Sequence, residues 1–354
     1  MALENIQLPP QIIVDAHQKI AHQALHLGHD YLRHPLALGE QPSRAGLPDA
    51  LLGRLAVVFA SIWTLPKQKN HKSALPRYET PRRAYELALH QWDYYQRLAD
   101  SSPQIWLVRT ASDLDQVLQT WQPSTPLNKR LQGLLLALSG ADPILEPRQF
   151  EEWYERGVRC VGLAYLETRY SGSAGGEAIG LTPLGFKLLD VLAEHQVLLD
   201  LARISRRGFL EALDRYDGPL LISHTYGKSM IDDEEDDEEE DDISSRHLVC
   251  RLAKRDGVVG VSVRHLSKNR QRASLEALVE RIDRICQWTG SSAYAALGSN
   301  LIPSTSEVVA PKDIETTGDL WKVGRALARR GYQPADVEAI LAGNWLRLLR
   351  RALP

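Results

Sequence analysis

The chain has few cysteines and no long apolar segment. Its three cysteines in 354 residues, Cys160, Cys250 and Cys286, lie far apart. An odd number at such spacing argues against a disulfide framework or a cysteine zinc motif. No run of about 18 or more apolar residues is present, so no membrane-spanning helix is expected. The first residues lack the basic region and apolar stretch of a signal peptide, and we therefore expect a cytoplasmic protein.

A concentrated positive charge is also missing. The formal net charge is −3, and residues 232–242 are all acidic, so removing these eleven charges leaves +8 spread over the rest of the chain. Without a compact basic patch, nucleic-acid binding is not expected. Self-repulsion should keep the acidic run extended, so we expect residues 232–245 to be a disordered loop in a single domain covering 1–354. An alternative interpretation is an interaction platform, in which this loop binds a basic protein partner.

Short apolar runs alternate with longer amphipathic segments, which is typical of a parallel sheet covered by helices. Nine runs are candidate strands: 12–17, 55–63, 104–109, 131–140, 160–165, 197–202, 219–224, 257–263 and 294–300. Helices are expected at 80–99, 147–157, 184–195, 206–216 and 274–289. The pattern predicts one (β/α)8 TIM-type barrel with eight strands and one misread run. A last helix at 333–350 is expected to complete the outer layer.

Two histidines, His17 and His224, close two of the strand candidates. Functional residues of such barrels gather at the carboxyl ends of the strands. A metal-dependent hydrolase needs several His, Asp or Glu ligands there. The positions that should complete such a site hold Lys19, Ser139 and Arg203. The scaffold therefore indicates a metal enzyme, whereas the ligand set is incomplete.

Several segments in order resemble one enzyme family. They read GLTPLGFKLLDVLAEHQVLLDLARIS (180–205), PLLISHTYGKSM, RHLVCRLAKRDGVVGVSV, AALGSN and YQPADVEAILAGNWLRLLR. This series resembles the renal or membrane dipeptidases, binuclear zinc peptidases with a barrel related to the amidohydrolases. The resemblance covers nearly the whole chain. It implies a zinc-dependent dipeptidase barrel and, as dimers are common in the family, a possible homodimer.

The resemblance implies five zinc-ligand positions, of which two are kept. The Asp-x-His-x-Asp motif of the first strand reads DAHQK, so His17 matches a ligand and Lys19 replaces a carboxylate. The bridging Glu corresponds to Ser139. The two histidines of the second zinc correspond to Arg203 and His224.

Three further positions differ from the family pattern. The substrate-polarising His corresponds to Tyr165, and the catalytic Asp corresponds to Asn300. The Arg that binds the substrate carboxylate corresponds to Lys228, which keeps the positive charge. The resemblance therefore implies altered catalytic groups beside a conserved cationic position.

The substitutions oppose zinc on physical grounds. A guanidinium offers no electron pair, and an ammonium offers one only after losing its proton. Two unit charges about 4 Å apart repel by roughly 4 kcal/mol at an effective dielectric near 20, and more for a divalent ion. The two cations are expected instead to neutralise Asp15, Asp142 or Asp200.

We therefore expect a dipeptidase-like protein that has lost binuclear zinc and peptidase activity. It would keep a cationic pocket for a small anionic ligand, such as an amino acid, a peptide carboxylate or a phosphate. The expected pocket residues are His17, Lys19, Arg203, His224, Lys228 and Asn300. The alternative is an active zinc-dependent dipeptidase or amide hydrolase with a residual site at His17 and His224, completed by Asp142, because two histidines and one carboxylate suffice for catalytic zinc.

A second group of histidines, His22, His26 and His29, falls at i, i+4 and i+7. A helix would align them on one face. No acidic residue accompanies them at the spacing of a zinc-peptidase helix. We expect them to be solvated surface residues.

Overall fold

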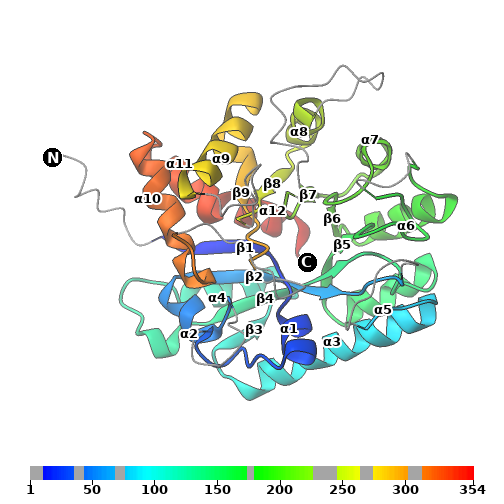
Figure 1. The fold of residues 1–354 in the computed structure, drawn as a ribbon, viewed down its shortest axis with the longest axis horizontal. Helices are drawn as coiled ribbons and strands as arrows, with labels where there is room; N and C mark the ends of the chain where they lie inside the picture. The colour runs from blue at the N-terminus through cyan, green and yellow to red at the C-terminus, as the bar shows by residue number, and fades with distance from the viewer. Residues whose placement is uncertain are drawn as a thin grey trace.

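Parallel strands form the centre of the molecule, and helices lie outside them (Figure 1). The computed structural model describes residues 11–35, 44–67, 76–173, 179–225, 245–263, 274–301 and 313–354. The main path of the sheet runs through β1 (Ile13–Gln18), β2 (Leu55–Trp63), β4 (Gln132–Ser139), β5 (Val158–Gly162), β6 (Leu198–Asp200), β7 (Leu220–Ile222), β8 (Val258–Val261) and β9 (Ala295–Leu297). Every pairing along it is parallel. The predicted (β/α)8 barrel is confirmed.

The ends of β1 and β9 are joined by polar contacts just beyond the strands. The Asn300 amide donates to the His17 carbonyl at 3.2 Å. The Ser299 amide donates to the Asp15 carboxylate at 2.6 Å, and the Ser299 hydroxyl donates to the same carboxylate. These bonds place the residues after β9 directly beside those that end β1.

All nine candidate runs contain a strand, and the one that lies off the main path is the short strand β3 (Ile105–Leu107). It pairs in parallel with the first residues of β4, through Ile105↔Gln132 to Leu107↔Leu134. β5 pairs with β4 only from Leu136 onward, so the start of the long strand β4 leaves an edge for β3. The expectation of a misread run was wrong because β4 extends beyond its barrel neighbour.

The five expected helices are present with ends within two residues. They belong to this series: α1 (Ile20–Leu27), α2 (Leu47–Leu52), α3 (Pro81–Ser101), α4 (Ala111–Gln119), α5 (Phe150–Glu155, after a 3-10 turn at Pro147–Gln149), α6 (Pro183–Glu194), α7 (Arg206–Arg215), α8 (Ser245–Lys254), α9 (Leu275–Thr289) and α10 (Trp321–Arg329). Short 3-10 turns lie at Leu127–Lys129, Ser292–Tyr294 and Thr317–Leu320. In the described part of the chain, no helix is long and apolar enough to cross a membrane.

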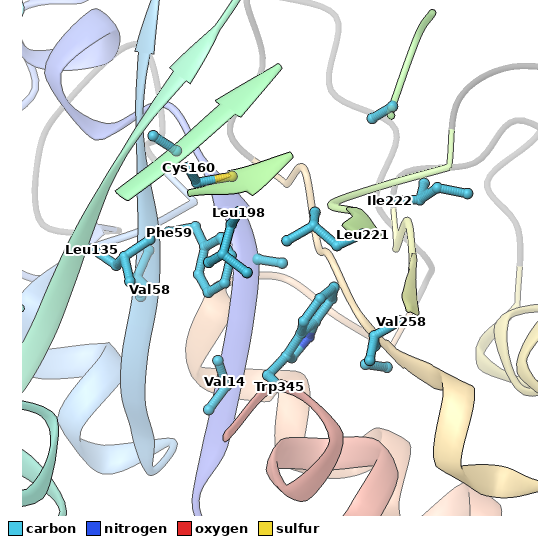
Figure 2. Packing of buried hydrophobic residues seen from close by; sticks show 14 of the residues in the cluster. Val14, Val58, Phe59, Leu135, Cys160, Leu198, Leu221, Ile222, Val258 and Trp345 are labelled. Carbon is cyan, nitrogen blue, oxygen red and sulfur yellow. The ribbon is translucent and has the colours of Figure 1, made fainter. Parts of the chain in front are cut away.

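The C-terminal segment does more than complete an outer layer. It forms α11 (Pro334–Glu338), a π-helical turn (Ala339–Gly343) and α12 (Asn344–Ala352). Trp345 is fully buried, its ring centroid lies 5.6 Å from that of Phe59, and its indole donates to the Leu297 carbonyl at 2.9 Å. Figure 2 shows this indole pointing into the hydrophobic cluster between the strands. The outer-layer expectation is corrected, because amphipathicity alone does not show that a buried Trp enters the barrel.

Helix α6 begins at a defined N-cap. Thr182 precedes Pro183, and its hydroxyl accepts a hydrogen bond from the Gly185 amide at 3.1 Å. Replacing Thr182 by alanine is expected to lower the free energy of unfolding by about 1 kcal/mol, because an amide at the helix start loses its partner. Urea denaturation measures the change. Thr182→Ser should retain wild-type stability, and an equal loss in both variants would contradict the capping role.

Two predictions fall on residues that the structure does not describe. Lys228 and the acidic run 232–242 lie in the interval 226–244, outside the described residues. Ser245, the last residue of the expected loop, already begins α8. The acidic loop and the single-domain organisation stay predictions.

Candidate functional site

The structure brings the two strand-end histidines together. The ring centroids of His17 and His224 lie 4.0 Å apart with planes at 27°, and each side chain is 3% exposed. His224 Nδ1 lies 2.9 Å from the Ser223 hydroxyl. His17 Nε2 is buried without a hydrogen-bond partner. The carboxyl ends of β1 and β7 therefore present a stacked imidazole pair.

The environment of this pair favours the uncharged form of His17. Burial lowers the pKa of His17 well below its ordinary value, and the neighbouring charges of His224, Lys19 and Arg203 act in the same direction. A neutral imidazole can accept or donate a single hydrogen bond or bind a metal. A neutral His17 therefore adds no positive charge to that of its neighbours.

Lys19 occupies an aromatic and polar enclosure. It is the N-cap of α1 and is only 1% exposed. Its Nζ lies 3.3 Å from the Tyr165 hydroxyl and 3.5 Å from the Asn300 Oδ1. The same atom lies 4.6 Å from the ring centroid of Trp63 and 5.0 Å from that of Tyr165. Aromatic faces attract cations, so this enclosure suits a protonated amine.

Arg203 packs against the same tyrosine. Its guanidinium carbon lies 4.0 Å from the Tyr165 ring centroid, and its Nε donates to the Tyr165 carbonyl at 2.7 Å. Arg203 and Asn300 have left-handed backbone angles, with φ of 67° and 47°. A left-handed arginine is costly, and such strain concentrates at functional sites. Arg203 and Asn300 therefore have a constrained backbone.

Ser139 has a serine partner at the end of β4. The hydroxyl oxygen of Ser139 lies 2.5 Å from that of Ser61 on β2. In the sheet, Ser139 pairs in register with Trp63. Ser139 is 9% exposed. A hydroxyl held by a second hydroxyl does not supply the anionic bridge that two zinc ions need.

Asp142 does not join the histidines as a third ligand. Its carboxylate accepts a hydrogen bond from the Tyr78 hydroxyl at 2.7 Å and another from the Arg169 amide at 3.0 Å. The Arg169 guanidinium pairs with it at 3.5 Å. Within the described ranges, no group of three or more His, Cys, Asp or Glu side chains could hold a metal ion. The residual site completed by Asp142 is therefore corrected.

The expected neutralisation of aspartates by Lys19 and Arg203 is also corrected. Asp15 accepts hydrogen bonds from Ser299 and from the Gln18 amide. Asp200 accepts from the backbone amides of Ser223 and Ala202 at 2.8 and 2.9 Å. Burial raises the pKa of Asp15 and of Asp200. Amide and hydroxyl donors at the strand ends therefore hold these two carboxyl groups, whereas Lys19 and Arg203 both contact Tyr165.

The expectation of solvated histidines after β1 was wrong for His22. This side chain is 3% exposed, and its ring lies edge-on to Trp63 with centroids 4.5 Å apart. α1 packs on β2 and α3, which covers one of its faces. Gly28 ends the helix with φ of 70°, so His29 does not continue it.

Sequence reasoning missed Trp63. It ends β2, contacts Lys19 and His22, and lies 5.0 Å from the Tyr165 ring in an edge-on arrangement. The available signal was its position as the last residue of a strand candidate, where barrel side chains face the functional end.

Protonation of His22 provides a test of this packing. Burial lowers the pKa of His22 to about 3, and the charges of His26 and Lys19 add to the effect. The unfolded chain takes up this proton near the ordinary value of 6.5. The unfolded state therefore binds more protons between these values, and stability falls as pH decreases through that window by up to about 1.4 kcal/mol per pH unit.

Urea unfolding with a chelator present, at several pH values between neutrality and about 4.5, measures this slope. His22→Gln is expected to reduce the slope by about one proton. A slope that does not change in the variant would contradict a neutral buried His22.

The described donors do not fit a binuclear zinc centre. Two imidazoles are accompanied by an ammonium, a guanidinium and a hydroxyl, and only the imidazoles are ready metal donors. The site lies at the carboxyl ends of β1, β4, β7 and β9 of an α/β barrel. This fold and placement define an α/β-barrel protein whose candidate site lies at the carboxyl ends of the strands and contains both imidazole and cationic side chains.

Comparison with known proteins identifies the family. The family model of membrane dipeptidase (peptidase family M19) matches residues 7–353, and the chain belongs to this family. This result agrees with the resemblance found in the sequence motifs.

Individual relatives are distant. Dipeptidase tcpJ of Claviceps purpurea is 23% identical over 310 residues, which cover 84% of this chain and 67% of that protein. Dipeptidase 3 of Rattus norvegicus is 23% identical over 290 residues, and the match spans 78% of this chain but only 54% of the rat protein. A metallo peptidase from Rhodobacter sphaeroides, solved with a phosphinate mimic of the dipeptide L-Ala-D-Ala, has a TM-score of 0.75 at 17% identity and covers 97% of this chain and 99% of its own. The structural likeness establishes the fold.

Proposed function

We propose that this family member has exchanged binuclear zinc for protein cations and binds a small carboxylate ligand without hydrolysing it. The observation that carries the proposal is the position of Lys19, 1% exposed and beside Trp63, Tyr165 and Asn300. A buried ammonium at this place opposes a metal ion and attracts an anion.

Each residue has a role in this proposal. Lys19 donates a charge-assisted hydrogen bond to the ligand carboxylate, and Arg203 adds a second positive charge. Tyr165 fixes both cations, because it contacts the Lys19 ammonium through its hydroxyl and the Arg203 guanidinium through its ring. His17 stays neutral and offers its unpartnered Nε2 to a polar group of the ligand. In a zinc peptidase the metal would activate water, and these residues do not supply that step.

The ligand class follows from the family and the charge. Relatives are dipeptidases by name, and the Rhodobacter sphaeroides structure holds an anionic dipeptide mimic. We therefore propose a dipeptide or amino acid with a free carboxylate as ligand. Isothermal titration with L-Ala-D-Ala and with its C-terminal amide tests this. The proposal requires tighter binding of the free acid and no hydrolysis with added zinc; equal affinities or zinc-dependent turnover would refute it.

A second candidate is a residual zinc hydrolase at His17 and His224. The buried, unpartnered Nε2 of His17 favours it, because such a nitrogen could bind a metal. It requires dipeptide hydrolysis that a chelator and His17→Ala both abolish.

A further inference from the structure

We propose that His22 and His26 form a binding site for one divalent transition-metal cation. This site is distinct from the pair His17 and His224 at the carboxyl ends of the strands, which we call the barrel mouth. Both histidines line a small pocket whose wall also includes Trp63, Leu87 and Gln91. The pocket lies between α1, the end of β2 and α3. This proposal does not rest on the proposed function, because neither histidine matches a zinc-ligand position implied by the family resemblance.

The helix places the two imidazoles as a pair. His22 and His26 are one turn apart on α1, and their ring centroids lie 4.9 Å apart with planes at 59°. Two histidines at i and i+4 on one helix face are a recurring metal-binding arrangement. Water would fill the remaining coordination positions, because His26 is only partly buried and the pocket is open to solvent.

An independent observation points to a ligand. His22 Nε2 is buried without a hydrogen-bond partner, and the residue as a whole is only 3% exposed. A buried polar atom without a partner is costly, and a coordinated cation would remove that cost. Gln91 does not serve this atom, because its side-chain amide bonds the Trp63 carbonyl and its oxygen accepts from the Trp63 amide.

The surroundings of both histidines favour the neutral form of the imidazole. Burial lowers the pKa of His22 to about 3 and also lowers the pKa of His26. The neutral imidazole is the form that donates an electron pair to a metal. Imidazole ligands suit Zn²⁺, Cu²⁺ and Ni²⁺, whereas Mg²⁺ and Ca²⁺ prefer oxygen. The cation class is therefore a divalent transition metal.

The test uses Zn²⁺ and Cu²⁺ as probes. Zn²⁺ is titrated calorimetrically into the full chain carrying His17→Ala and His224→Ala, so that the barrel-mouth histidines contribute nothing. We expect one ion per chain, and Cu²⁺ at the same site should give an electron paramagnetic resonance spectrum with imidazole nitrogen couplings. Adding His26→Gln should weaken Zn²⁺ binding by about tenfold or more, since even partners outside the coordination shell are worth that much.

His247→Gln on α8 is the matched control and should leave the affinity unchanged. Absence of stoichiometric binding, or an affinity that His26→Gln does not alter, would overturn the proposal. If the double-alanine chain does not fold, the wild-type chain with and without His26→Gln decides the question, because the proposal requires the loss of one bound ion.

Discussion

Replacing Lys19 by aspartate, Ser139 by glutamate and Arg203 by histidine is expected to produce a chain that binds two zinc ions at the barrel mouth, in addition to any ion at His22 and His26. With His17 and His224, these changes recreate the five ligand positions that the family resemblance implies. They also remove two cations, each of which would repel a metal ion about 4 Å away by roughly 4 kcal/mol or more. Histidine tolerates the left-handed backbone at position 203 better than most residues.

Elemental analysis after exposure to zinc and dialysis measures the gain. Lys19→Asp alone is the control and should bind less metal, because Arg203 and Ser139 remain in place. A folded triple variant that takes up no more zinc than the wild type would show that the three substitutions do not explain the change in ligand set. Dipeptide hydrolysis by the triple variant would further support the match of these three positions to the family's zinc-ligand positions.

Lys19→Met is expected to weaken binding of a dipeptide carboxylate by about tenfold to a hundredfold. A hydrogen bond to a charged group contributes about 1.5 to 3 kcal/mol, and the methionine cannot provide it. Its apolar side chain still fits between Trp63 and Tyr165, so the free energy of unfolding should be equal or greater. Titration calorimetry and urea denaturation measure the two quantities.

The amide form of the ligand provides the control for Lys19→Met. Its affinity should change little, because it presents no carboxylate to the ammonium. Equal losses for acid and amide would mean that Lys19 shapes the pocket without recognising charge. A large loss of stability would mean that the lysine mainly supports packing.

The barrel and the strand-end residues could be predicted from the sequence. Runs of apolar residues with polar ends mark the strands, so His17 on β1 and His224 after β7 were expected at the same end of the barrel. The stacking of their rings at 4.0 Å was not predictable, because it depends on side-chain rotamers and on neighbours from distant segments. The same applies to β3, whose pairing depends on the relative lengths of β4 and β5.

The electrostatic partners were harder to predict. Sequence reasoning placed Asp142 near the site but could not foresee that Tyr78 and Arg169 would hold its carboxylate. It also treated His22 as solvated, because an i, i+4 spacing does not reveal which helix face is covered. Trp63 covers that face and also encloses Lys19, so one aromatic residue connects two features that appear unrelated in the sequence.

The carboxylates at the strand ends of the barrel have hydrogen-bond partners within the protein. Asp15 and Asp200 are held by amide and hydroxyl donors from the adjacent strand ends, which do not depend on zinc. Lys19 and Arg203 lie beside Tyr165 at positions where the family resemblance implies metal ligands. Our proposal that the site binds an anion rests on these two cationic side chains.

Metal analysis of the wild-type chain beside the His17→Ala, His224→Ala double variant tests the central claim most directly. Both proteins are purified without chelators or an affinity tag. The account predicts the same zinc content in both, since any ion at His22 and His26 is common to them. Zinc present in the wild type and lost in the double variant would contradict it and establish a metal site at the barrel mouth.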